Sequence, residues 1–151
     1  MPGTVNGADD ARAKTSELIE SGVDWIKLMN AEQWSLDELR AVVDEFAPER
    51  VLLGEVFGSP AMLRRYLGDG DGLQLVFLFD FLAYTYTAGF FRARIEAYER
   101  DFAPPLLPTY VLENHDRSRL IDRVGGHLGK ARTLAVLLCT LRGVPTIYQG
   151  Q

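Results

Sequence analysis

Two acidic side chains stand where apolar stretches of the chain end, and both are candidates for chemistry. Glu55 lies inside the apolar run of residues 51–56, and Asp116 ends a polar cluster that follows the apolar residues 110–112. A carboxylate in apolar surroundings is costly unless it is hydrogen-bonded or takes part in a reaction. We therefore predict a functional site at the ends of these two stretches. The structural alternative is that Glu55 bonds a neighbouring backbone group and that His115 and Asp116 cap the next helix.

Both acids are expected to be positioned by a parallel β-sheet. Strand-like and helix-like patterns alternate along the chain, which predicts an α/β fold with right-handed crossovers. The carboxyl ends of parallel strands lie at one edge of the sheet, where such proteins keep their chemistry. The pattern has too few strands for a closed barrel, so the chain is an open doubly wound sheet or a piece of a (β/α) barrel. We predict strands at residues 23–29, 51–56, 73–79, 109–113 and 144–148, and helices at residues 9–21, 35–47, 59–68, 88–102 and 128–142.

The composition indicates one globular domain over residues 9–151, after a loose lead-in at residues 1–8. The chain has 151 residues, of which 47% are hydrophobic, and this is enough for a core. Its net charge of −5, with acidic and basic residues intermixed, argues against nucleic acid or a membrane surface as a partner. No apolar run is long enough to span a bilayer, and no signal pattern precedes the domain, so we expect a cytoplasmic protein.

The sequence contains no motif that implies a cofactor or a metal ion. It has no glycine-rich phosphate loop after a predicted strand, no HExxH and no paired CxxC. Cys139 is the only cysteine, which excludes an internal disulfide. Its apolar helical neighbours predict that Cys139 packs in the core.

Three segments at or near predicted strand ends resemble the α-amylase family of glycoside hydrolases, in particular its α-glucosidase-like members. These segments are residues 53–57 (LGEVF), residues 114–116 (NHD) with Arg119 beyond them, and residues 143–151 (GVPTIYQGQ), and residues 75–80 lie where the family's sixth strand is expected. They follow the order of the family's fifth to eighth strands, and the resemblance covers residues 35–151. It implies a partial (β/α)8 TIM barrel, with about strands four to eight of the family's catalytic domain.

The resemblance also implies roles for individual residues. Glu55 corresponds to the general acid/base, Asp116 to the carboxylate that stabilises the transition state, and His115 to a sugar contact. Asn114 and Arg119 fall in the same substrate-binding motif. Hydrolysis of a glycosidic bond needs a proton donor and a second carboxylate, and the apolar neighbours of Glu55 are expected to keep it protonated. The implied substrate is an α-glucosidic oligosaccharide, with no cofactor and no metal.

Two positions depart from the family pattern. Residues 22–29 match the family's fourth strand, and this match places Lys27 where the family has an arginine and Met29 where it has the nucleophilic aspartate. A methionine side chain cannot form a glycosyl ester. We therefore expect the chain to be inactive on its own.

Other interpretations of the sequence remain open. Residues 1–34 also resemble, weakly, a barrel segment of metal-dependent amidohydrolases, in which a lysine such as Lys27 is carboxylated and bridges metals. The chain could then be a chimera, a metal-dependent hydrolase, or a non-catalytic structural or carbohydrate-binding half-barrel. A half-barrel leaves two open sheet edges, which predicts self-association or pairing with a missing half-barrel.

Overall fold

The computed structural model describes residues 8–23, 26–27, 35–45 and 50–151. Its helices and strands alternate over most of this part of the chain, as the sequence pattern predicts. In chain order the elements are α1 (Ala8–Glu20), α2 (Leu36–Asp44), β1 (Leu53–Gly54), α3 (Pro60–Leu67), β2 (Leu75–Leu78), the 3-10 helix η2 (Phe79–Leu82), α4 (Ala88–Asp101), β3 (Thr109–Val111), α5 (Leu120–Arg123), α6 (Leu128–Thr140) and β4 (Val144–Thr146).

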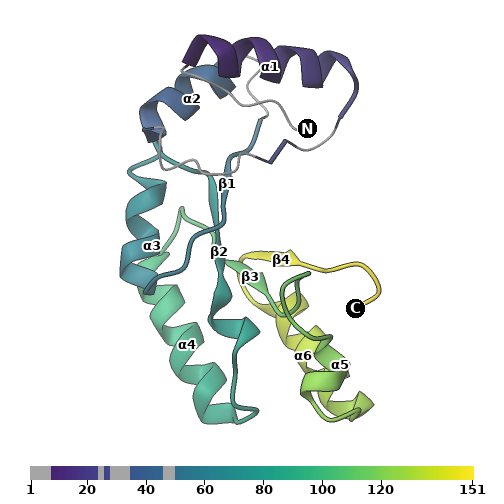
Figure 1. The fold of residues 1–151 in the computed structure, drawn as a ribbon. Helices are drawn as coiled ribbons and strands as arrows, with labels where there is room; N and C mark the ends of the chain where they lie inside the picture. Colours follow the sequence, from purple (N-terminus) through teal and green to yellow (C-terminus); the bar gives the residue numbers. More distant parts are fainter. Residues whose placement is uncertain (1–7, 24–25, 28–34, 46–49) are drawn as a thin grey trace.

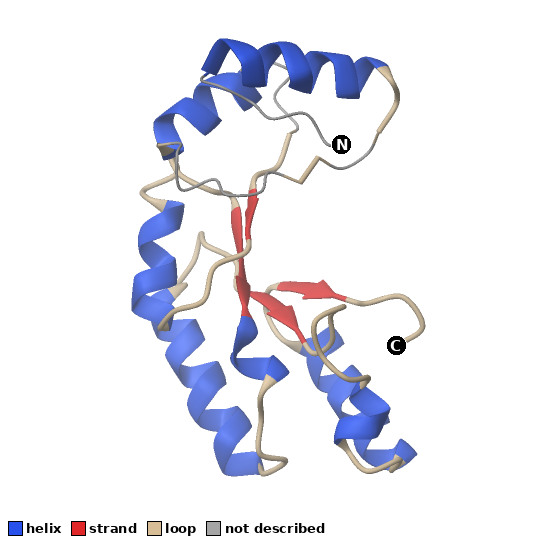
Figure 2. Cartoon of the chain, in the orientation of Figure 1, coloured by secondary structure: helices blue, strands red, loops and turns tan. Residues whose placement is uncertain are grey.

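The strands form a single parallel sheet in the order β1-β2-β3-β4 (Figure 2). Leu53 pairs with Leu75, Phe77 pairs with Thr109, and Thr109 pairs with Val144. Each crossover carries helical segments, and α3 and α4 run along one side of the strands (Figure 1). This arrangement confirms the prediction of a partial (β/α) barrel.

The first two predicted strands differ from the structure. Within the predicted strand at residues 23–29, the described residues Val23, Ile26 and Lys27 are not in a strand, and the others lie outside the described residues. The predicted strand at residues 51–56 shrinks to the two residues of β1. Gly54 lets β1 lie close to the residues that lead into β2, because a Cβ at this position would lie 2.5 Å from the Leu73 side chain.

The two faces of the sheet carry different apolar clusters because side chains alternate along a strand. Val76, Leu78 and Tyr110 pack with the helices in the larger core. Phe77 and Val111 instead belong to a smaller cluster with Phe79 and Leu82 on the other face. The sheet is therefore apolar on both faces, as expected for strands of a barrel wall.

An arginine at the end of α6 ties the last crossover to α4. Arg142 donates to the Glu99 carboxylate and to the carbonyls of Leu106 and Phe102, each at 2.7 Å. The chain then enters β4 through Gly143, whose φ of +149° and close contact with the Pro108 carbonyl exclude a side chain. These contacts fix where β4 begins and hence where its carboxyl end lies.

One side chain of α6 that was predicted to be buried is exposed. Cys139 is exposed, so the prediction that it packs in the core is wrong. Leu134 and Leu138 are the buried residues of the apolar run at residues 134–139, and Val136 is 63% exposed.

No helix in the part of the chain that the structure describes is long and apolar enough to cross a membrane.

Replacing Tyr110 with phenylalanine should leave stability at neutral pH unchanged or raised, and should reduce the loss of stability in alkali. The Tyr110 hydroxyl is buried, and no group among the described residues hydrogen-bonds it. Burial, reinforced by the charge of Glu99, raises the pKa of Tyr110 to about 12, against about 10 in an unfolded chain. Ionisation of Tyr110 therefore leaves the free energy of unfolding unchanged below about pH 10. As the pH rises from about 10 towards 12, this tyrosine ionises in the unfolded chain first, and the free energy of unfolding falls.

Thermal melts of wild type and Tyr110→Phe at pH 7 to 11.5 measure this difference, which should approach about 1.4 kcal/mol per pKa unit. Tyr86→Phe, at an exposed tyrosine, is the control and should follow wild type. Burial also raises the pKa of Tyr98, so the phenylalanine variant retains part of the alkaline loss. Equal alkaline losses in wild type and Tyr110→Phe would contradict the prediction.

Candidate active site

The carboxyl ends of the strands meet at one edge of the sheet, and we call this edge the rim. All neighbouring strands are parallel, so the segments that follow them emerge on the same side. Glu55 follows β1 directly, the Asn114–His115–Asp116 segment follows β3, and Tyr148 follows β4. The fold therefore brings the two predicted motifs to a common edge.

Glu55 is less enclosed than its apolar neighbours in the sequence suggest. Its side chain is 35% exposed, and its Oε2 lies 3.1 Å from the Nζ of Lys27. Because β1 is only two residues long, Glu55 already belongs to the loop beyond the strand. The expectation that apolar surroundings enclose this carboxyl is wrong, and a lysine that precedes the sheet in sequence is its charged partner.

Asn114, His115 and Asp116 form one hydrogen-bonded turn at the rim. The Asp116 amide donates to Asn114 Oδ1 at 3.2 Å, and the Asn114 side-chain nitrogen donates to Asp116 Oδ2 at 3.4 Å. His115 Nε2 lies 3.3 Å from Asp116 Oδ1, and the side chains of His115 and Asp116 are 60% and 55% exposed. The turn thus presents an acceptor and a donor towards solvent in a defined geometry.

Glu113, immediately before this turn, is the buried acid of the segment. Its side chain is only 1% exposed. One oxygen accepts from Arg119 Nη1 at 2.5 Å, and the other accepts from the Leu120 amide at 2.6 Å. Glu113 was not among the residues predicted for the site. Its position at the end of the apolar strand could have indicated that its carboxylate is buried.

Arg119 links the ends of the last two strands instead of standing free. The same Nη1 that contacts Glu113 also donates to the Gln149 carbonyl at 2.6 Å. The guanidinium lies 4.8 Å from the centre of the Tyr148 ring. That Arg119 also contacts substrate stays a prediction, and its contacts in this structure are with Glu113, Gln149 and Tyr148.

The predicted site residues are thus gathered in two groups. Asn114, His115 and Asp116 contact one another, whereas Glu55, among the described residues, pairs with Lys27 and makes no hydrogen bond or ion pair with these three. Met29, at the nucleophile position, lies outside the described residues. No cluster of three or more His, Cys, Asp or Glu side chains in the described ranges could hold a metal ion.

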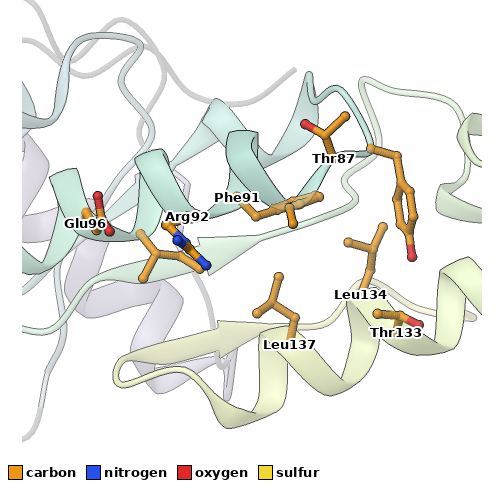
Figure 3. A pocket seen from close by; sticks show the side chains of 10 residues that line it. Thr87, Phe91, Arg92, Glu96, Thr133, Leu134 and Leu137 are labelled. Carbon is orange, nitrogen blue, oxygen red and sulfur yellow. The ribbon is translucent and has the colours of Figure 1, made fainter.

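A cavity of about 600 Å³ lies between α4 and α6 (Figure 3). Phe91 and Ile95 of α4 face Leu134 and Leu137 of α6 across it. None of the predicted site residues lines this cavity. It is a gap between two helices on the helical side of the sheet, and it contributes no group to the rim chemistry.

The chain is similar to proteins of one family over most of its length. Residues 21–151 match the family model described as the α-amylase catalytic domain. This match includes the segment around Lys27 that also resembles amidohydrolases. The chain is 36% identical over 126 residues to a probable α-glucosidase of Rhizobium meliloti (strain 1021), covering 77% of this chain and 22% of that protein.

Two insect proteins are similar to the chain as well. It is 28% identical over 121 residues to a salivary α-glucosidase of Anopheles gambiae, covering 74% of this chain and 20% of that protein. It is 27% identical over 114 residues to an α-glucosidase of Apis mellifera, covering 75% of this chain and 20% of that protein. The chain therefore spans about a fifth of the length of these curated relatives.

Proposed function

Because the chain belongs to the α-amylase family of glycoside hydrolases, we propose that it forms part of a site for cleaving α-glucosidic bonds of oligosaccharides. Glu55 is the general acid/base, and Asp116 stabilises the positive charge that develops on the sugar. His115 and Asn114 hold sugar hydroxyls. The observation that supports this proposal is the topology, which places the segments after β1 and β3 at one rim.

In this proposal the chain binds sugar but does not complete hydrolysis on its own. Glu55 must give up its ion pair with Lys27 before it can donate a proton to the leaving oxygen. The second carboxylate that a retaining hydrolase needs is replaced by Met29. The names of the relatives support α-glucosides as the substrate class.

A non-catalytic carbohydrate-binding role is the second candidate, and the Lys27–Glu55 ion pair favours it. Lysine and carboxylate side chains together can hydrogen-bond sugar hydroxyls without any reaction. Both candidates predict saccharide binding at the rim, and they differ in whether a restored nucleophile produces turnover. As part of the proposal, the outer strands β1 and β4 of the described sheet lead to self-association or pairing with a missing half-barrel.

Maltotriose should bind the protein at the rim with roughly millimolar affinity. Titration followed by ¹⁵N NMR measures the affinity, and sedimentation of the same sample reports self-association. His115→Gln should weaken binding because it removes a predicted sugar contact. His127→Gln is the control, since His127 precedes α6 and has no predicted contact.

An aryl α-glucoside incubated with wild type should show no turnover above that of the Glu55→Gln variant. Absence of maltotriose binding would contradict the proposal as a whole. Turnover by wild type that is lost in Glu55→Gln would contradict the part that assigns inactivity to the missing nucleophile.

A further inference from the structure

We propose that the ring of Tyr148 is a stacking surface for a sugar ring, held in place by Arg119 at the rim. This inference rests on the proposed function and adds a subsite to it. Tyr148 lies in the family-like segment of residues 143–151, and the sequence assigned it no role of its own.

The position of Tyr148 follows from the direction of β4. This strand runs parallel to β3, so the residue that emerges beyond its carboxyl end shares the rim with the Asn114–Asp116 turn. Tyr148 is half-buried, so its ring rests partly on protein and is partly accessible. An aromatic ring beside a few fixed polar groups is the usual composition of a small-ligand site.

The loop that carries the ring is closed on itself. The Gln151 amide donates to the Tyr148 carbonyl at 3.0 Å, and the Tyr148 amide donates to Gln151 Oε1 at 3.2 Å. Gly150 takes the positive φ of +75° that this turn needs. The backbone that carries the ring is therefore held before any ligand arrives, which lowers the entropy lost on binding.

Arg119 supports the ring from one face. Its guanidinium lies 4.8 Å from the ring centre, and it is itself anchored by the buried Glu113 and by the Gln149 carbonyl. Arg119 is thus a positioning residue, because it acts through the Tyr148 loop. The ring face opposite the guanidinium is the one that a ligand can use.

A neutral pyranose matches this surface. One side of the sugar ring presents C–H groups that pack on an aromatic face, and its edge presents hydroxyls. The exposed carboxylate of Asp116 and the imidazole of His115, on the neighbouring strand end, supply hydrogen-bonding groups for that edge. The ligand class is an uncharged oligosaccharide.

A cation over a tyrosine ring is not by itself a ligand site in this protein. Arg123 lies 5.1 Å from the ring of Tyr84, whose hydroxyl is buried, and Lys130 lies 5.1 Å from the ring of Tyr86. Tyr86 lines the cavity between α4 and α6, to which Asn114, His115 and Asp116 contribute no side chain. Tyr148 is instead linked through Arg119 to Glu113, next to the Asn114–Asp116 turn, and Tyr86 offers a matched control.

The test compares maltotriose affinities of wild type, Tyr148→Ala, Tyr148→Phe and Tyr86→Ala by NMR titration. Tyr148→Ala should bind about tenfold more weakly, whereas Tyr148→Phe should stay within about twofold because the ring face is kept. Tyr86→Ala should match wild type. Transferred nuclear Overhauser effects in wild type should connect the Tyr148 ring protons to sugar C–H protons, and this measurement needs no variant.

The outcomes separate this inference from the proposed function. Wild type that binds maltotriose as tightly as Tyr148→Ala, or binds it without Tyr148 ring contacts, would overturn the stacking surface and leave the proposed function standing. Equal losses in Tyr148→Ala and Tyr148→Phe would also overturn it, because a hydroxyl contact would then explain the binding. No binding by wild type would overturn the proposed function, and the inference with it.

Discussion

Replacing Met29 with aspartate is expected to give the protein hydrolytic activity toward an aryl α-glucoside. Met29 stands two positions after Lys27, where the family resemblance places the nucleophile, and Lys27 Nζ lies 3.1 Å from Glu55. A retaining hydrolase needs its two carboxyl groups about 5 Å apart, and the substitution supplies the absent one. The gain over wild type should be roughly 10³-fold, since loss of a nucleophile costs at least this much in well-studied hydrolases.

Release of the aryl group, followed by absorbance, measures this gain. Met29→Asn is the matched control, because the amide has the size of aspartate but cannot form a stable glycosyl ester. Adding Glu55→Gln to Met29→Asp should remove the gained activity. A Met29→Asp variant that binds maltotriose and stays at the rate of Met29→Asn would favour the non-catalytic binding role.

The segments with clear local signals were predicted well from the sequence. Residues 109–113 combine β-branched and aromatic side chains with a proline before them, and β3 forms there. Ser59 and Pro60 predict the start of α3, where Ser59 Oγ accepts from the Met62 amide at 3.3 Å. In these cases the local preference and the final packing agree.

It was harder to predict which side chains are buried and which are exposed where a stretch of sequence is uniformly apolar. The run of residues 134–139 is apolar all round, so helical periodicity cannot say that Leu134 and Leu138 face the core while Cys139 is exposed. Glu55 was expected to be enclosed because its sequence neighbours are apolar, but the strand before it ends at Gly54. Both errors come from using neighbours in sequence for neighbours in space.

The candidate site shows the same limit. The turn of Asn114, His115 and Asp116 could be selected from residue types alone, because its partners are adjacent in the chain. The role of Arg119 could not, since it depends on Gln149 and Tyr148 at the end of another strand. Glu113 is buried and Asp116 is exposed although both belong to one short segment, and the residue types do not indicate which of the two side chains faces the core.

Replacing Arg119 with methionine is expected to destabilise the protein more than replacing its partner Glu113 with glutamine. The Glu113 side chain is 1% exposed, whereas Arg119 is 42% exposed. Removing the arginine leaves a buried carboxylate whose remaining hydrogen-bond donor, among the described residues, is the Leu120 amide, at a cost of about 3 kcal/mol. Glu113→Gln keeps an acceptor for that amide and leaves a guanidinium that water can reach, at a cost of about 1 kcal/mol.

Urea unfolding of the two single variants and of the double variant measures these costs and their coupling. The double variant should be more stable than Arg119→Met alone, because it no longer buries an unpaired charge. Arg132→Met, at an exposed arginine of α6, is the control and should stay within about 0.5 kcal/mol of wild type. If Glu113→Gln cost more than Arg119→Met, or if the two effects simply added, Glu113 would be stabilised by groups other than Arg119, and the link between the ends of β3 and β4 would not depend on this ion pair.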